Sequence, residues 1–455
     1  MLDTNHGALR HRRLTRRPVV LTGLLVMSLL MTASPPPAAA DPVADWNATA
    51  LSALLAAGHN NLTVTRGLTM VQVAVHDALN AMERRYDGYM FEGPAEANAS
   101  PEAAVATAAR DTLVLAIPAF GPAAQQAAAI ATTDAAYTAA LATIPDGEGK
   151  TRGIAAGRAA AAAIVGLRKD DGATRDAPYT PGGAPGQWRP HPNPVPADPP
   201  IADPVLASGY VASLLPGWGK VTPFTLLAAG QFHPAGSPPL GSEVYTQDFN
   251  EVKRLGGKAS AARTAEQTEI ARFWYEGSAA GWNRIARGVA AEKTLDPWAQ
   301  ARLLALLNMA MADGFIAGWH TRYLYDFWRP VTAIRFADTD GNPATEPDPT
   351  WESVLNTPPV PDYPSTHSVL GGAAAAVLAA VFGTDQVAFT MTSGAPFAGI
   401  TRAFTSFSQA AQENADSRVY AGVHFRTACR DGVVLGQKIG RRAARLWLLP
   451  SEPRG

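Results

Sequence analysis

Three separated stretches of the sequence bring arginine and histidine together at spacings that could serve chemistry. The first contains Arg322 and Arg329, which are seven residues apart and would lie two turns apart on one face of a helix. The second is the run Pro-Asp-Tyr-Pro-Ser-Thr-His-Ser at residues 361–368. The third contains Arg418 and His424, six residues apart. Each stretch alone is a weak signal, because arginine commonly pairs with aromatic neighbours on protein surfaces.

The middle stretch has the composition of a helix start. Prolines at positions 358, 359, 361 and 364 precede a run of small and apolar residues at 369–382. Proline presets the backbone for a first helical turn, so we expect Ser365, Thr366 and His367 at a helix N-terminus. The free N–H groups and the positive dipole end of such a helix bind anions. An ordinary Ser or Thr N-cap with a nearby histidine would give the same sequence, so this stretch alone leaves both interpretations open.

Together the three stretches would supply three guanidinium groups, a hydroxyl, a helix N-terminus and two imidazoles. Arginine side chains match the oxygens of phosphate-like anions through bidentate hydrogen bonds. One imidazole could attack or coordinate the central atom while the other moves protons. This combination predicts a site for a tetrahedral oxyanion.

The order of the motifs resembles that of a known superfamily. The pattern Arg/Lys-x6-Arg-Pro, then Pro-Ser-x-His, then Ser-Arg-x5-His is similar to that of the vanadium-dependent haloperoxidases and type 2 phosphatidic acid phosphatases. The chain looks most like the exported bacterial proteins grouped with vanadium chloroperoxidase, because residues 45–47, 248–253 and 327–335 also match them. The resemblance therefore spans most of residues 41–455.

The resemblance implies a role for each motif residue. The groups that would bind oxygens of vanadate or phosphate are the side chains of Arg322, Arg329, Arg418 and Ser365 and the backbone N–H of Thr366. His367 would be the acid–base residue beside the apical oxygen. His424 would be the apical ligand of vanadium, or the nucleophile of a phosphatase.

Three positions depart from the pattern of that superfamily. Arg322 stands where lysine is usual, and Thr366 stands where glycine usually precedes the histidine. An aspartate that often follows the last histidine by four residues is replaced by Ala428. The nearest acid is Asp431, which on a continuous helix would share a face with His424 and is a candidate orienting residue.

The resemblance implies a vanadate-dependent haloperoxidase that uses hydrogen peroxide to oxidise halide. The same motifs fit a secreted acid phosphatase that needs no cofactor and acts on phosphate monoesters through a phosphohistidine. The three departures suggest a further alternative, a secreted anion-binding protein whose catalysis has lapsed. The chain-wide match, and a sequence without the set of spanning helices typical of lipid phosphatases, favour the haloperoxidase.

The segments that must position these residues are predicted to be helical, so the fold class is all-α. Apolar periodicity or alanine-rich composition indicates helices at 44–58, 66–82, 101–117, 122–143, 150–168, 243–256, 262–275, 281–293, 296–320, 369–382, 408–421 and 428–447, with a short bent one at 323–336. No run of alternating strand residues is recognised. Residues 171–242 are rich in proline and aromatic residues and are predicted to form a long ordered loop. We expect a single domain over 41–455, with the motifs inside 262–447, and the resemblance implies an architecture of two four-helix bundles.

The N-terminus has the composition of a cleaved export signal over residues 1–40. Five arginines precede an apolar run at 19–31, and small residues follow up to position 40. No later segment is recognised as long and apolar enough to span a bilayer. We therefore expect a periplasmic or extracellular protein, of bacterial type, without membrane insertion of the mature chain.

Composition argues against several other classes of protein. The formal net charge of -1 provides no basic surface for nucleic acid. The single cysteine, Cys429, excludes an intrachain disulfide and a cysteine-rich zinc site. The sequence leaves the oligomeric state, the halide preference and the organic substrate open.

Overall fold

The computed structural model describes residues 41–93, 98–175, 177–191 and 213–451. Residues 41–455 form one compact unit. The predicted export signal at 1–40 and residues 192–212 of the predicted loop lie outside the described residues.

The first half of the unit is a set of helices, and side chains cap the starts of α1, α2 and α3. These helices are α1 (Pro42–Ala56), α2 (Asn61–Asn80), α3 (Pro101–Ala116), α4 (Ala123–Ala142) and α5 (Glu148–Arg168), with the short 3-10 turn η1 (Ile117–Ala119) after α3. Asp41 and Asn60 each accept two backbone N–H groups at the starts of α1 and α2. Such side-chain caps satisfy N–H groups that have no partner within the helix.

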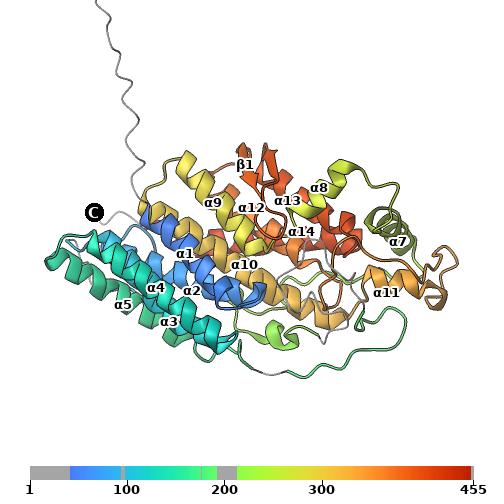
Figure 1. Cartoon of the computed structure of the whole chain (residues 1–455), viewed down its shortest axis with the longest axis horizontal. Helices are drawn as coiled ribbons and strands as arrows, with labels where there is room; N and C mark the ends of the chain where they lie inside the picture. The colour runs from blue at the N-terminus through green and yellow to red at the C-terminus, as the bar shows by residue number, and fades with distance from the viewer. Residues whose placement is uncertain (1–40, 94–97, 176, 192–212, 452–455) are drawn as a thin grey trace, which may run out of the picture. The chain divides into compact units, whose positions relative to one another are not determined.

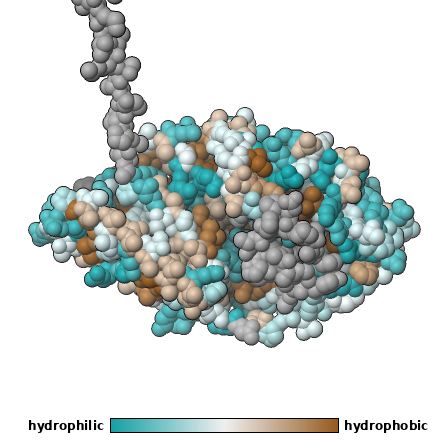
Figure 2. All heavy atoms as spheres, viewed as in Figure 1, coloured by the Kyte–Doolittle hydropathy of each residue, from teal (hydrophilic) through white to brown (hydrophobic). Residues whose placement is uncertain are grey.

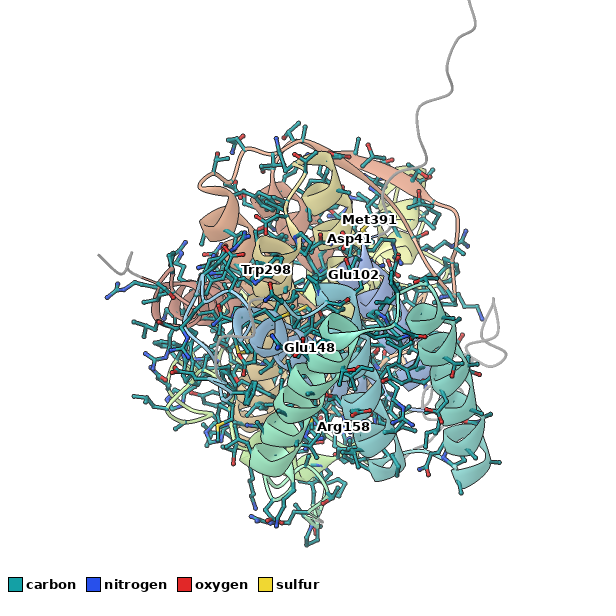
Figure 3. The ribbon with its side chains drawn as sticks, turned by 90° about the vertical axis from the view of Figure 1, so that its left-hand side faces the viewer. Asp41, Glu102, Glu148, Arg158, Trp298 and Met391 are labelled. Carbon is teal, nitrogen blue, oxygen red and sulfur yellow. The ribbon has the colours of Figure 1, made fainter. Side chains whose placement is uncertain are left out.

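Helices α3 and α5 approach each other closely and begin at the same end of the unit. A Cβ atom at Gly153 of α5 would lie 2.4 Å from the carbonyl oxygen of Ser100, and one at Gly157 would lie 2.4 Å from that of Ala104. Figure 3 looks onto this side, with Glu102 at the start of α3 near Glu148 at the start of α5. Glycine is needed at these positions because any side chain would separate the two backbones.

The second half carries the motif residues. Its helices are α7 (Glu243–Gly256), α8 (Ala265–Phe273), α9 (Ser278–Glu292), α10 (Pro297–Tyr325), α11 (Pro330–Arg335), α12 (Thr366–Phe382), α13 (Phe407–Tyr420) and α14 (Arg426–Leu446), with the 3-10 turn η3 (Ala337–Thr339) after α11. Helix α12 packs directly on α14, where a Cβ atom at Gly436 would lie 1.9 Å from the carbonyl oxygen of Val369. The predicted all-α fold class is confirmed, since helices make up most of the described chain.

Helix α10 is the central element of the unit. It lies between α1 and α2 on one side and α12 and α14 on the other (Figure 1). The expectation that no segment after the leader is long and apolar enough to cross a membrane was wrong for this helix, which passes both criteria. Its apolar window is 94% buried inside the protein, so the composition reflects a core position. On the face drawn in Figure 2, hydrophobic residues occur in small separate groups among polar ones.

One feature contradicts the expectation that the chain has no strands. Strands β1 (Phe389–Thr392) and β2 (Thr401–Phe404) form an antiparallel hairpin, with Phe389 opposite Phe404 and Thr392 opposite Thr401. The alternation of buried and exposed residues in β1 covers only four positions. So short a pattern is not separable from irregular sequence by periodicity alone.

Among the described residues between α5 and α7, the only helical element is the 3-10 turn η2 (Pro216–Lys220). Three aromatic residues of this segment, Trp188, Trp218 and Phe224, are buried. Asp313 of α10 anchors the segment, because its carboxylate accepts the backbone N–H groups of Phe224 and Thr225 at 2.6 and 2.7 Å. This anchor holds residues 213–242 against the core helix that carries part of the site.

Candidate active site

The three sequence stretches meet at one small cavity of about 80 Å³. The motif residues on its wall are Arg322, Arg329, Thr366, His367, Arg418 and His424. The rest of the wall is formed by Asn60, Asn61, Leu62, Leu214, Tyr275, Ser278, Phe315, Trp319 and Pro358. A larger groove of about 810 Å³ lies beside α7, but it is lined by none of the motif residues.

The two arginines of the first motif reach the cavity from different elements. Arg322 lies in the last turn of α10, which ends where Asp326 adopts a left-handed conformation (φ 50°, ψ 39°). Arg329 is extended (φ -84°, ψ 156°) and precedes α11. The prediction that both share one helical face was therefore wrong. Pro330 disfavours helical backbone at the residue before it, which explains the extended conformation of Arg329.

Arg322 forms hydrogen bonds to residues at the start of α12. Its Nη2 atom donates to the carbonyl oxygen of Pro364 at 2.8 Å and to the hydroxyl of Thr366 at 3.3 Å. Its guanidinium also lies over the ring of Trp319, 4.9 Å from the centroid. Positions 322 and 366, at which the sequence departs from the pattern of the superfamily it resembles, are thus in direct contact.

The other two guanidinium groups present buried N–H donors that have no partner among the described residues. These donors are Nη2 of Arg329 and both Nε and Nη1 of Arg418. Burial lowers the pKa of Arg329 to about 10 and also lowers those of Arg322 and Arg418. Buried cationic N–H donors without hydrogen-bond partners destabilise a protein unless a bound anion accepts hydrogen bonds from them. The residues present therefore fit a tetrahedral oxyanion such as vanadate.

His424 is held between a carboxylate and a guanidinium. Its Nδ1 lies 2.8 Å from Oδ1 of Asp362, and its Nε2 lies 2.9 Å from Nη1 of Arg329. Nη1 of Arg329 can only donate and lies nearer to Nε2 than to Nδ1, which is 3.2 Å away, so the contacts favour Nε2 as the accepting nitrogen and Nδ1, beside Asp362, as the protonated one. Burial, followed by the nearby arginines, holds the pKa of His424 well below its ordinary value. The neutral ring thus directs its lone pair away from Asp362.

Asp362 is a candidate site residue that sequence reasoning missed. The orienting residue proposed from the sequence, Asp431, instead accepts a hydrogen bond from the hydroxyl of Tyr363 at 2.7 Å and pairs with Arg430. The helical spacing behind that proposal does not apply, because α14 begins after His424. One signal was available, since Asp362 lies inside the 361–368 motif itself.

His367 is fixed by a backbone contact on one side of its ring. Its Nε2 lies 3.2 Å from the carbonyl oxygen of Glu276, so this nitrogen carries the proton and donates. Nδ1 is left as the proton-accepting atom. Burial and, next, the charge of Arg418 hold the pKa of His367 well below its ordinary value.

The hydroxyl assigned from the sequence does not face the cavity. Ser365 is fully buried, its Oγ accepts from Ser368 Oγ at 3.0 Å, and it is absent from the cavity wall. The neighbouring Thr366 lines the cavity as the first residue of α12. Its backbone N–H has no partner within the helix and remains suited to an anion.

Two further helix starts reach the cavity and were not predicted to do so. Asn60, Asn61 and Leu62 lie at the start of α2, and Ser278 is the first residue of α9. Together with α12, these helices direct positive dipole ends toward the same small space. No signal in the sequence joined these segments to the motifs, because their proximity depends on how the helices pack.

Part of the sequence is similar to known vanadium chloroperoxidases. Residues 302–448, which contain all the motif residues, match the family model of the VCPO second helical-bundle domain. A curated relative, vanadium chloroperoxidase of Curvularia inaequalis, is 28% identical over 289 residues. That match covers 48% of this chain and 46% of the relative, so the chain spans about half the length of the curated protein it matches.

Solved structures extend the likeness over the whole unit. A bacterial vanadium-dependent iodoperoxidase superposes with a TM-score of 0.74 at 24% identity, covering 91% of this chain and 98% of that one. A holo-type bacterial vanadium-dependent chloroperoxidase gives a TM-score of 0.66 at 18% identity, covering 91% and 94%. The fold is therefore that of the bacterial vanadium-dependent haloperoxidases, and the predicted resemblance is confirmed.

Proposed function

We propose that this chain is a vanadate-dependent haloperoxidase that uses hydrogen peroxide to oxidise halide. The observation that carries the proposal is the set of buried, unpartnered N–H donors of Arg329 and Arg418 around a cavity that also holds two neutral histidines. The likeness to a vanadium chloroperoxidase and to bacterial vanadium-dependent haloperoxidase structures supports it. When bound, vanadate would supply a Lewis-acidic centre that activates peroxide without a change in oxidation state.

Residues of this chain would bind the anion and transfer protons. Arg322, Arg329 and Arg418 would bind its oxygens, and Nε2 of His424 would be the ligand atom for vanadium. Arg329 Nη1, now 2.9 Å from that nitrogen, would turn to an oxygen of the anion. Asp362 keeps the His424 proton on Nδ1, which leaves Nε2 unprotonated. His367 would accept and return a proton at Nδ1.

The size of the cavity favours small inorganic reactants. A volume of about 80 Å³ holds roughly a few water molecules, which is room for one oxyanion and a small neighbour. This volume does not exclude a phosphate monoester whose organic group lies outside the cavity. The acid phosphatase alternative therefore becomes an outcome of the test below, as does the lapsed anion-binding protein.

The proposal includes export of the protein with cleavage of a signal within residues 1–40. The basic residues, apolar run and small residues within 1–40 support a cleaved signal, and a reactive oxidant suits a periplasmic or extracellular site of production. Fractionation of cells expressing the chain, with N-terminal sequencing of the mature protein, tests this part. A cytoplasmic protein that retains residues 1–40 would contradict it.

Activity assays test the reaction itself. The purified protein is loaded with orthovanadate and assayed for peroxide-dependent halogenation of a phenol dye with chloride, bromide and iodide. Hydrolysis of a nitrophenyl phosphate is measured in parallel without vanadate. We expect halogenation that His424→Ala abolishes. Hydrolysis without halogenation would establish the phosphatase instead, and a folded protein inactive in both assays would support the lapsed alternative.

A further inference from the structure

We propose that the hydroxyl of Thr366, held in place by Arg322, is a hydrogen-bond donor to the tetrahedral anion in this cavity. It would take the role that the sequence resemblance gives to Ser365. The inference rests on the proposed function only in requiring that the cavity binds such an anion. It concerns which hydroxyl recognises that anion.

The hydrogen-bond inventory of Thr366 leaves its proton available. A threonine hydroxyl offers one donor and two acceptor positions. Its Oγ1 accepts from Arg322 Nη2 at 3.3 Å, and a guanidinium cannot accept in return. Thr366 Oγ1 donates no hydrogen bond to any described residue. The side chain is 6% exposed and lines the cavity, so the unused proton lies next to the anion site.

Ser365 is placed for a different contact. It is fully buried and does not form part of the cavity wall. Its Oγ receives the hydrogen of Ser368 Oγ, and its backbone N–H donates to the carbonyl oxygen of Ala428 at 3.0 Å. The backbone contact joins the start of α12 to α14, and the side-chain contact lies within the first turn of α12.

A glycine on α10 makes room for the Thr366 side chain. A Cβ atom at Gly318 would lie 2.7 Å from Cγ2 of Thr366, so the methyl group packs where a side chain at 318 would be. Gly318 lies one helical turn before Arg322, the residue that binds the hydroxyl. The packing of this methyl group against Gly318 and the hydrogen bond from Arg322 together favour one rotamer of the β-branched Thr366 side chain. Donation from a cation also makes the hydroxyl a better donor.

Binding measured by calorimetry with orthovanadate and with orthophosphate tests the inference without relying on turnover. We expect Thr366→Val, which keeps the shape and removes the hydroxyl, to weaken both anions about ten- to a hundredfold, as for a hydrogen bond to a charged group. Thr366→Ser keeps the hydroxyl and should bind within about threefold of wild type. Ser365→Ala should also stay within about threefold.

A second variant covers the case in which Thr366→Val fails to fold. In Gly318→Ala, the alanine Cβ should push against the Thr366 methyl group, displace the Thr366 hydroxyl and weaken anion binding. Adding Thr366→Ser, which removes the methyl group, should restore anion binding in the Gly318→Ala background. Wild-type affinity in Thr366→Val, or an equal loss in Ser365→Ala, would overturn the inference while leaving the proposed function intact. A wild-type protein that binds neither anion would overturn both.

Discussion

The carboxylate of Asp362 lies 2.8 Å from Nδ1 of His424, and both side chains are almost completely buried. Asp362 belongs to the loop before α12, whereas His424 precedes α14. The contact joins two of the three motif stretches. It also fixes which nitrogen of His424 faces the anion site.

Replacing Asp362 by asparagine should weaken both orthovanadate binding and halogenation about ten- to a hundredfold, the usual effect of losing a carboxylate that orients a ligand histidine. The matched control is Asp431→Asn, because Asp431 contacts Tyr363 and Arg430 and not His424. Calorimetry and steady-state kinetics on both variants check this. An equal loss in Asp431→Asn would contradict the assignment.

Affinity for an anion that does not use His424 as a ligand, such as sulfate, should increase as the pH falls. Burial raises the pKa of Asp362 to about 7, against the lowering effect of Arg329 and Arg322. Below that pH Asp362 takes up a proton, one negative charge beside the anion is removed, and the anion binds more tightly. The gain is at most about tenfold per pH unit for one linked proton.

Sulfate is the suitable probe for this pH dependence, since its own charge stays constant over the range. We expect its affinity to rise from about pH 8 to about pH 6, with a flatter profile in Asp362→Asn. Sulfate affinity independent of pH in the wild type would show that Asp362 does not change its protonation there.

Arg418 should reduce the stability of the anion-free protein. Its Nε and Nη1 are buried without partners, so Arg418→Met removes an uncompensated charge and should stabilise the anion-free protein by about 1–3 kcal/mol. The same change should abolish the rise in melting temperature that phosphate produces in the wild type. Thermal unfolding with and without phosphate measures both effects.

Arg402 provides the opposite case for comparison. Its guanidinium pairs with Glu266, Glu269 and Glu413, so it is fully partnered and lies away from the cavity. Arg402→Met should lower the melting temperature and leave the phosphate effect unchanged. A destabilised anion-free Arg418→Met would show that Arg418 has a structural role in place of a binding one.

The anchor at Asp313 should be a major contributor to stability. Its buried carboxylate accepts three backbone N–H groups, from Phe224, Thr225 and Leu226. Asp313→Ala leaves these groups unpaired and should lower the free energy of unfolding by roughly 3 kcal/mol or more. Urea unfolding measures the change, with the exposed Asp170→Ala as a control expected within about 0.5 kcal/mol of wild type. A change no larger than that of the control would exclude the anchoring role.

Local patterns predicted most of the helices. For example, the predicted helix at 243–256 coincides with α7, and the alanine-rich segments at 122–143 and 150–168 became α4 and α5 within two residues at each end. Helix propensity and capping act over a few residues, so the sequence carries them directly. The hairpin of β1 and β2 was missed, because its stability depends on Phe389 and Phe404 packing together across fifteen residues.

The sequence by itself determined the chemical inventory of the site: three arginines, two histidines and a helix start in a fixed order. Only the tertiary structure decided how they are used. It placed Asp362 and not Asp431 beside His424, turned Thr366 and not Ser365 toward the cavity, and broke the helix between Arg322 and Arg329. The physical reason is that side-chain identity is local, whereas hydrogen-bond partners and cavity walls arise from helix packing between residues distant in the chain.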